Sequence, residues 1–409
     1  MRTLWLDFSL AARNIVRQRR RSAVAVGAVA FGIAALILAS GFIEWIFVDF
    51  RESTIKSQLG HVQIVRRGYH DAGKANPYAF LLPDTIPELE AHDMPKEIKT
   101  VAPRLSFSGL ISRGESTISF IGDGVSPKAE AAFGNGLHMT AGTGLSEDDP
   151  HSVIVGAGLA RNLGVGVGDR VVLLASTASG GTNAVEVTVR GLFSTVTKAY
   201  DDAALRVPLV TARTLLRTKG SHVWIVLLND TAHTDAMIAK LRAQLAQDQL
   251  EVVPWYQLAD VYNKTTTLFT KQVQGVRIII ALIILLSISN TMATSVMERI
   301  GEIGTSMALG IKRRGIMRLF LCEGVLLGCF GGTAGMLIGV AMAAVISAIG
   351  ISMPPPPGMA HGFTGEILVT WNSALQSLLL AVGTTLAASI FPAWKASRME
   401  IVNALRHNR

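Results

Sequence analysis

Four long apolar segments dominate the pattern of hydrophobic and polar positions along the chain. Each is long enough to cross a bilayer as an α-helix, and they occupy residues 22–48, 276–297, 319–351 and 371–394. The first is longer than the apolar region of a signal peptide, so we expect it to remain as an anchor. The spacing predicts one spanning helix, a large insert, and then three more spanning helices.

The insert at residues 49–275 has a different pattern. Six short runs rich in β-branched residues are bounded by glycine, proline or aspartate, and they predict strands at residues 61–65, 117–122, 152–156, 170–175, 184–193 and 223–228. Helical spacing predicts a helix at residues 235–247 and favours a short one at residues 211–218. The fold class is therefore a membrane protein with four transmembrane helices and a large α+β domain inserted after the first.

Three connecting segments add to this picture. Residues 49–59 and 257–276 contain no proline, so we expect both to prolong their spanning helices as a helical stalk, with ordinary linkers as the alternative. Residues 352–370 separate the last two spans. Their prolines predict a stiff, extended spacer or a docking surface, and they are Pro354, Pro355, Pro356 and Pro357.

The composition agrees with a membrane protein. Of 409 residues, 49% are hydrophobic and only 17% are charged, and the mean hydropathy is +0.39. The net charge of +8 comes from basic residues that cluster beside the apolar segments. That placement fits topology and contact with anionic lipids, so we expect membrane lipids and no nucleic acid as partners.

The basic clusters also predict the topology. Residues 1–21, 298–318 and 395–409 are rich in arginine and lysine, which places them in the cytoplasm with both termini. The insert and residues 352–370 then lie outside. The N-terminal segment has an apolar face that carries Leu4, Phe8, Ala11 and Ile15. It predicts either an amphipathic helix in the membrane interface or a solvated helix with topogenic arginines.

Two features concern the second half of the chain. Residues 298–318 are charged and helix-compatible, and they lie between two spans, where a soluble cytoplasmic partner can reach them. The third span carries small residues on one face, which lets membrane helices approach closely. These predicted packing positions, within this chain or between copies, are Gly324, Gly328, Gly332, Gly335 and Gly339.

The sequence offers no enzyme motif. It contains no Walker A sequence, no GxSxG and no HExxH, and the glycines at Gly164, Gly166 and Gly168 fit a turn better than a phosphate loop. We therefore expect no catalytic, cofactor-binding or metal-binding residues in this chain. Any ATPase must be a separate chain.

Several stretches resemble one family. They are ERIGEIGTSMALGIKRRGIMRLFLCEGVLLGCFGGTAGMLIG, FPAWKASRMEIVNALR near the C-terminus, ARNIVRQRRRS near the N-terminus and VIVGAGLARNLGVGVGDRVVLL in the insert. Together with the one-plus-three spans they resemble ABC transporter permeases of the MacB/FtsX/LolC-LolE type, with a MacB-like periplasmic core domain. GHVQIVRRGYHD is most similar to the lipoprotein-releasing, LolC/LolE-like branch.

The resemblance implies a permease in the bacterial inner membrane that pairs with a second copy or a paralogue. A cytoplasmic ABC ATPase would hold ATP and Mg²⁺, and its work would reach the periplasm by mechanotransmission. The cargo would be a lipoprotein or a hydrophobic or peptide substrate, with a periplasmic adaptor, lipoprotein or chaperone as a further partner. The alternative is an FtsX-like regulator that activates a cell-wall hydrolase without cargo. The implied ATPase-coupling residues are Glu298, Arg299, Glu302, Ile303, Gly304, Met307, Leu309 and Gly310.

Overall fold

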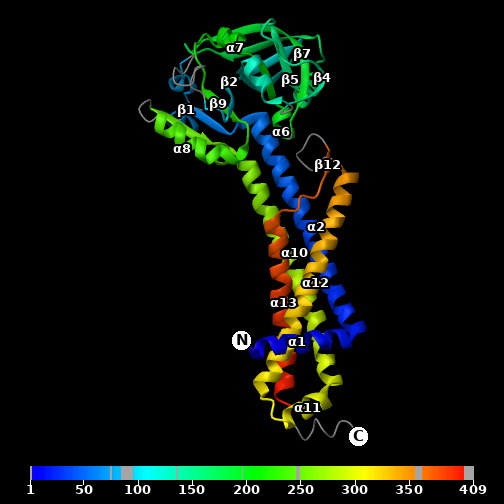
Figure 1. Ribbon diagram of the computed structural model, residues 1–409. Coiled ribbons are helices and arrows are strands. Elements are labelled where there is room, and N and C mark those ends of the chain that lie inside the picture. The colour runs from blue at the N-terminus through cyan, green and yellow to red at the C-terminus, as the bar shows by residue number, and fades with distance from the viewer. Residues whose placement is uncertain are drawn as a thin grey trace. The chain divides into compact units, whose positions relative to one another are not determined.

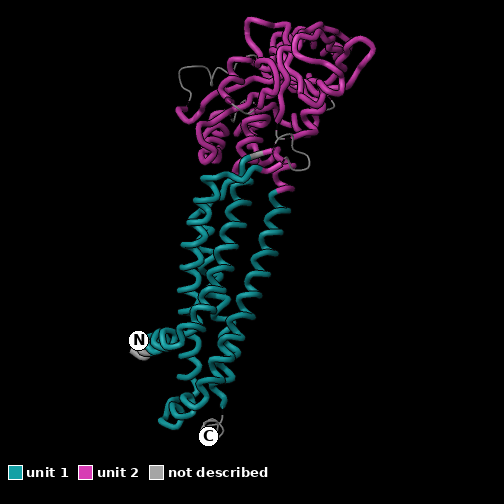
Figure 2. Tube along the Cα trace, turned by 90° about the vertical axis from the view of Figure 1, so that its right-hand side faces the viewer, with its two compact units in different colours: residues 1–47, 266–352, 364–409 teal, residues 48–265, 353–363 magenta. Residues whose placement is uncertain are grey.

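A computed structural model describes residues 2–73, 76–83, 95–134, 137–195, 197–245, 249–354 and 362–399. The chain forms two compact units (Figure 2). The helical unit comprises residues 1–47, 266–352 and 364–409, and the sheet unit comprises residues 48–265 and 353–363. Of the predicted proline spacer, Pro355, Pro356 and Pro357 lie outside the described residues, as does the tail beyond residue 399.

Four long helices and two shorter ones, α1 (Arg2–Arg17) and α11 (Ile300–Ala308), make up most of the described part of the helical unit (Figure 1). The long helices are α2 (Arg19–Thr54), α10 (Asp260–Glu298), α12 (Arg313–Ile349) and α13 (Trp371–Ser397). Within the described part of the chain, four helices are long and apolar enough to cross a membrane, namely α2, α10, α12 and α13. Large apolar side chains such as Phe31, Leu286 and Phe391 remain exposed on them. Lipid is the solvent that suits such surfaces.

Two of these helices are longer than a bilayer requires. A π-helical turn (Ile55–Leu59) prolongs α2, which gives a helical stretch of 41 residues, and α10 has 39 residues. At 1.5 Å per residue both are about 60 Å long, against about 30 Å of hydrocarbon in a bilayer. Most of both segments that we expected to prolong the spans, residues 49–59 and 257–276, is helical.

The glycines of α12 lie where this helix packs against two different neighbours. A Cβ at Gly324 would come 2.0 Å from Ser389 Oγ of α13, and Gly328 and Gly332 face the same helix. A Cβ at Gly335 would instead come 2.5 Å from the carbonyl oxygen of Ala30 on α2, and Gly339 also faces α2. The glycine stripe therefore serves close helix packing within this chain.

A ten-stranded sheet forms the second unit, in the order β10-β1-β9-β2-β3-β8-β5-β7-β4, with β6 pairing to β2 and β7. Its strands are β1 (Val62–Arg66), β2 (Ile98–Arg113), β3 (Ser116–Val125), β4 (His138–Gly142), β5 (Ser152–Gly156), β6 (Arg170–Ser176), β7 (Thr182–Ser194), β8 (Ala204–Pro208), β9 (Val223–Leu228) and β10 (Leu250–Pro254). The β3–β8 and β5–β7 pairs are parallel and the others are antiparallel. All six predicted strands are confirmed.

Short helices complete the structure. They are α3 (Tyr69–Ala72), α4 (Pro127–Ala131), α5 (Ala157–Leu163), α6 (Lys198–Asp201), α7 (Leu209–Leu216), α8 (Thr234–Gln244) and α9 (Trp255–Leu258), and β11 (Ile351–Met353) pairs with β12 (Phe363–Gly365). The predicted helices at residues 235–247 and 211–218 correspond to α8 and α7. One apolar core packs α5 and α7 on the sheet, and another packs α8. Strand β2 contributes Ile98 to the second and Leu105 to the first, so it joins both cores.

We expect His61 to make the stability of the sheet unit depend on pH. Its Nδ1 accepts a hydrogen bond from the Leu228 backbone N–H (3.1 Å), and its Nε2 lies 2.9 Å from Thr231 Oγ1. Burial lowers the pKa of His61 from 6.5 to about 4. The unfolded chain therefore binds the proton first, and stability is lost as the pH falls below 6.5 towards 4.

We expect the melting temperature of the purified chain to fall over that range, and His61→Gln to reduce the fall. The matched change at an exposed histidine of the same unit, His233→Gln, should leave the pH profile as it is. Identical profiles for the His61 variant and the parent chain would contradict this prediction.

Candidate coupling site

The segment between the second and third spans folds as a short helix with sharp ends. Helix α10 ends at Glu298, and the backbone breaks at Arg299 (φ −107°, ψ 17°) before α11 begins. Gly310 ends α11 with a φ of +94°, a left-handed conformation that favours glycine, and its N–H donates to the Met307 carbonyl at 3.1 Å. Helix α12 then starts at Arg313.

One face of α11 is locked into the helical unit. Ile303, Gly304 and Met307 are buried, and the two larger side chains pack in a cluster with Phe320 of α12 and Ala393 of α13. These three predicted coupling residues hold the helix in place. Their burial means that they position the helix and do not form its outer surface.

The end of α11 and the turn after it form a continuous exposed stretch. Leu309 is 82% exposed and Ile311 is 48% exposed, and Lys312, Arg313 and Arg314 follow, all exposed. We call these five residues the docking turn. An exposed apolar pair with cations beside it suits contact with a soluble protein that has an apolar pocket and an acidic rim.

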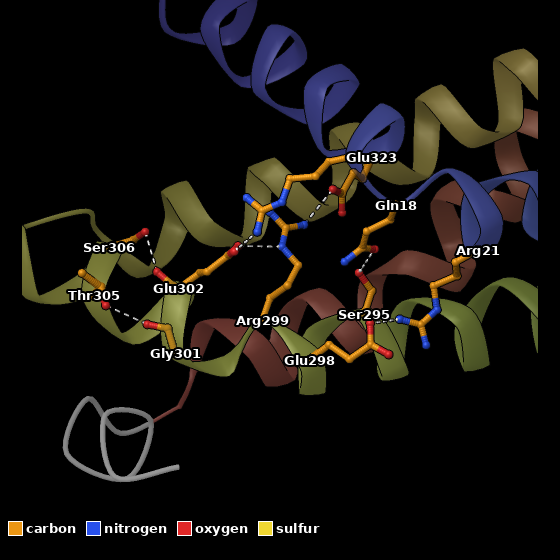
Figure 3. Close-up of polar contacts among 11 residues, drawn as sticks. Gln18, Arg21, Ser295, Glu298, Arg299, Gly301, Glu302, Thr305, Ser306 and Glu323 are labelled. Atoms are coloured by element: carbon orange, nitrogen blue, oxygen red, sulfur yellow. Dashed lines mark hydrogen bonds and ion pairs between the residues drawn. The ribbon is translucent and has the colours of Figure 1, made fainter. Parts of the chain in front are cut away.

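Arg299 is the centre of an ion-pair network at the root of α11 (Figure 3). Its Nε lies 3.2 Å from Glu302 Oε2, and its Nη1 lies 3.0 Å from Glu323 Oε1 on α12. Its guanidinium also lies over the Phe320 ring, 5.9 Å from the centroid. The Arg299 side chain is only 13% exposed and that of Glu323 only 6%, so water screens this pair poorly.

The N-terminal segment joins the same network. Arg17 at the end of α1 pairs with Glu302, and Arg21 near the start of α2 pairs with Glu298 at 2.5 Å. Between them, Gln18 Oε1 accepts a hydrogen bond from Ser295 Oγ at 3.2 Å (Figure 3). The elbow between α1 and α2 is thus connected to both α10 and α11.

The charge of Glu302 is maintained by its partners. Partial burial alone would raise the pKa of this carboxyl, but hydrogen bonds from Arg17 and Arg299 outweigh it and leave the pKa below its ordinary value of 4.5. Glu302 is therefore ionised at neutral pH, and its pairs weaken only in acid.

The structure sorts the predicted coupling residues into three groups. Glu298, Arg299 and Glu302 form ion pairs, Glu298 with Arg21 and the other two with each other. Ile303, Gly304 and Met307 are buried, and Leu309 and Gly310 lie at the exposed end. No pattern in the sequence indicated that Arg17, Arg21 or Glu323 would pair with this segment. The signal that could have found them is opposite charge at the adjoining ends of neighbouring apolar segments.

Two family profiles match the chain. The MacB-like periplasmic core domain matches residues 22–244, which is more than half of the chain, and the FtsX-like permease C-terminal domain matches residues 276–401. The first covers α2 and most of the sheet unit. The second covers the candidate coupling site and the last spanning helices.

Curated relatives agree with these profiles. An uncharacterised ABC transporter permease of Methanocaldococcus jannaschii is 25% identical over 66% of this chain and 66% of its own length. The lipoprotein-releasing system transmembrane protein LolC of Xylella fastidiosa is 27% identical over 63% of this chain and 65% of its own length.

A third relative is the macrolide export ATP-binding/permease protein MacB of Syntrophobacter fumaroxidans. It is 32% identical over 39% of this chain, which spans only 21% of that relative. The aligned regions of all three relatives thus cover at most about two thirds of their length. On the two profile matches and these relatives, the chain belongs to the FtsX-like ABC transporter permeases with a MacB-like periplasmic core domain.

Proposed function

We propose that the chain is a permease subunit whose docking turn binds a separate cytoplasmic ATPase. The observation that carries the proposal is the exposed pair Leu309 and Ile311, beside three cations, at the end of a helix whose other face is locked in place. ATP and Mg²⁺ would bind in the ATPase. The basic residues near this site support a cytoplasmic position for it and for both chain termini, in the inner membrane of a bacterium.

The network around Arg299 would carry the motion of the ATPase into the membrane. It ties α11 to α12 through Glu323 and to the end of α1 through Arg17, and the separate pair of Arg21 with Glu298 ties the start of α2 to α10. A push on α11 would therefore move several helices together. Helices α2 and α10 each continue into residues of the sheet unit, where the periplasmic work would be done.

This mechanism does not require a polar tunnel for the cargo. We propose a lipoprotein, or another hydrophobic or peptide substrate, because two relatives are a lipoprotein-releasing transmembrane protein and a macrolide exporter. A second copy or a paralogue would complete the transporter, with a periplasmic adaptor or chaperone as a further partner.

The double variant Leu309→Glu and Ile311→Glu tests the docking turn. Two aliphatic side chains lost from an interface cost about 3 kcal/mol, so we expect about a hundredfold less ATPase to co-purify from native membranes. Val210→Glu is the matched control, because Val210 is also largely exposed but lies in the sheet unit. Equal ATPase recovery from the double variant and the control would contradict the proposal.

A further inference from the structure

Side chains of the sheet bind the end of the helical stretch that begins with the first spanning helix. The last carbonyl oxygens of a helix lack partners within it. Here Arg206 Nη2 lies 2.5 Å from the Ser57 carbonyl oxygen, and Arg104 Nη1 lies 2.6 Å from that of Gln58. Gln63 Nε2 donates to the next carbonyl, that of Leu59, at 3.1 Å. Three successive carbonyls of the π-helical turn are thus bound by side chains of the sheet.

Both arginines are buried on strands within the sheet, Arg104 on β2 and Arg206 on β8, and they share one carboxylate. Arg104 binds Glu130 in a bidentate manner, with distances of 2.7 and 3.0 Å, and Arg206 Nη1 lies 3.0 Å from Glu130 Oε2. Their side chains are 4% and 1% exposed. We call Arg104, Glu130 and Arg206 the carbonyl clamp.

The charges of the clamp explain why it holds a helix end. One carboxylate does not neutralise two guanidinium groups, and the C-terminal end of a helix carries partial negative charge. Besides Glu130, the two guanidinium groups therefore bind the carbonyl oxygens at this negative end of the helix. Burial by itself would raise the pKa of Glu130, but the two arginines hold it below its ordinary value.

Steric contact also holds the end of the π-helical turn against the sheet. The chain leaves the turn through Gly60, whose φ is +66°. A Cβ at Gly60 would lie 2.1 Å from Ile225 Cγ2 on β9, so the backbone passes directly against the sheet. The helix end is thus held by both charge and contact.

From this geometry we infer that the carbonyl clamp is the joint that makes the sheet unit follow the end of the first spanning helix as one rigid body. Arg104, Glu130 and Arg206 are positioning residues in this role. The inference rests on the proposed function, because it assigns the clamp to the transmission of ATP-driven motion. A purely structural ion cluster would stabilise the domain without affecting that transmission.

The test uses the full chain with its ATPase in lipid nanodiscs, and it reads hydrogen exchange with and without ATP. In Arg206→Met we expect amide exchange at residues 58–62 to become at least about tenfold faster, and the ATP-dependent change in exchange of the sheet unit to be lost. ATPase co-purification and ATP hydrolysis should persist. Arg190→Met, which breaks a surface pair with Asp149 in the same unit, should change neither exchange reading.

A triple variant separates coupling from stability. Arg104→Met, Glu130→Leu and Arg206→Met together remove every charge of the clamp, so no charge of the clamp is left buried without its partner. We expect this variant to fold and bind the ATPase and still to lose the ATP-dependent change. A folded triple variant that keeps the change would overturn the inference.

If the methionine variants do not fold, Arg206→Lys decides the matter. One ammonium group does not reproduce the fork that binds both Ser57 and Glu130. Loss of the ATP-dependent change in Arg206→Lys supports the inference, and its retention overturns it. If the parent chain binds no ATPase, the proposed function fails, and that result is distinct from either outcome for the clamp.

Discussion

Replacing Gly328 of α12 with leucine is expected to destabilise the helical unit strongly. A Cβ at this position would lie 2.2 Å from Thr385 Oγ1 and 2.9 Å from the Cα of Val382. One of these contacts is backbone, so α12 and α13 must move apart. Overpacking of this kind costs about 1–3 kcal/mol, and more where backbone has to shift.

The measurement is the thermal unfolding of the purified chain in detergent, followed by the loss of monodisperse protein. Gly383→Leu is the matched control, because no atom lies within 4 Å of a Cβ at Gly383 on the neighbouring helix α13. We expect the control to unfold close to the parent temperature. Equal unfolding temperatures for the two leucine variants would contradict the close packing of α12 on α13.

Arg299→Met is expected to have the largest effect at the coupling site. It removes the cation that pairs with the buried Glu323. It also removes one of the two arginines that pair with Glu302. Breaking a buried pair by removing one partner costs about 3–5 kcal/mol, because the remaining charge stays in a poor solvent. We expect a lower unfolding temperature in nanodiscs. We also expect ATP hydrolysis to cause a smaller change in the hydrogen exchange of the sheet unit.

Two further variants make this prediction specific. In Arg299→Met with Glu323→Leu, no unpaired buried charge remains, so part of the lost stability should return. Arg170→Met breaks a pair with Glu186 in the sheet unit whose side chains are 77% and 59% exposed, and such surface pairs contribute about 0–1 kcal/mol. A double variant no more stable than Arg299→Met would argue against a buried ion pair at this position.

Local patterns along the chain predict much of this fold. Long apolar segments indicate the spanning helices, and β-branched runs such as residues 152–156 and 223–228 coincide with β5 and β9. The pattern of β-branched runs does not predict strand β2, because this strand is rich in polar residues and contains Pro103. The structure pairs Pro103 with Trp224 of β9, and pairing with β3 begins only at Arg104, so the missing N–H leaves no strand partner unsatisfied on that side.

The candidate site depends on contacts that no local pattern contains. Arg17 meets Glu302 across 285 positions of sequence, and Arg21 meets Glu298 across 277. The sequence does not show which glycines of α12 face α13 and which face α2, because this depends on how the helices cross. Charge and spacing predict an accessible segment between the second and third spans, whereas the structure is needed to show which of its residues are buried, paired or exposed.

The proposed function requires a cytoplasmic ATPase that binds the docking turn. The measurement that tests this is photo-crosslinking in native membranes, with a photoreactive amino acid placed at Leu309 and, for comparison, at the exposed Val210 of the sheet unit. The account predicts that an ABC ATPase is captured at position 309 and not at position 210. Capture of no ATPase at position 309, or equal capture at both positions, would contradict it.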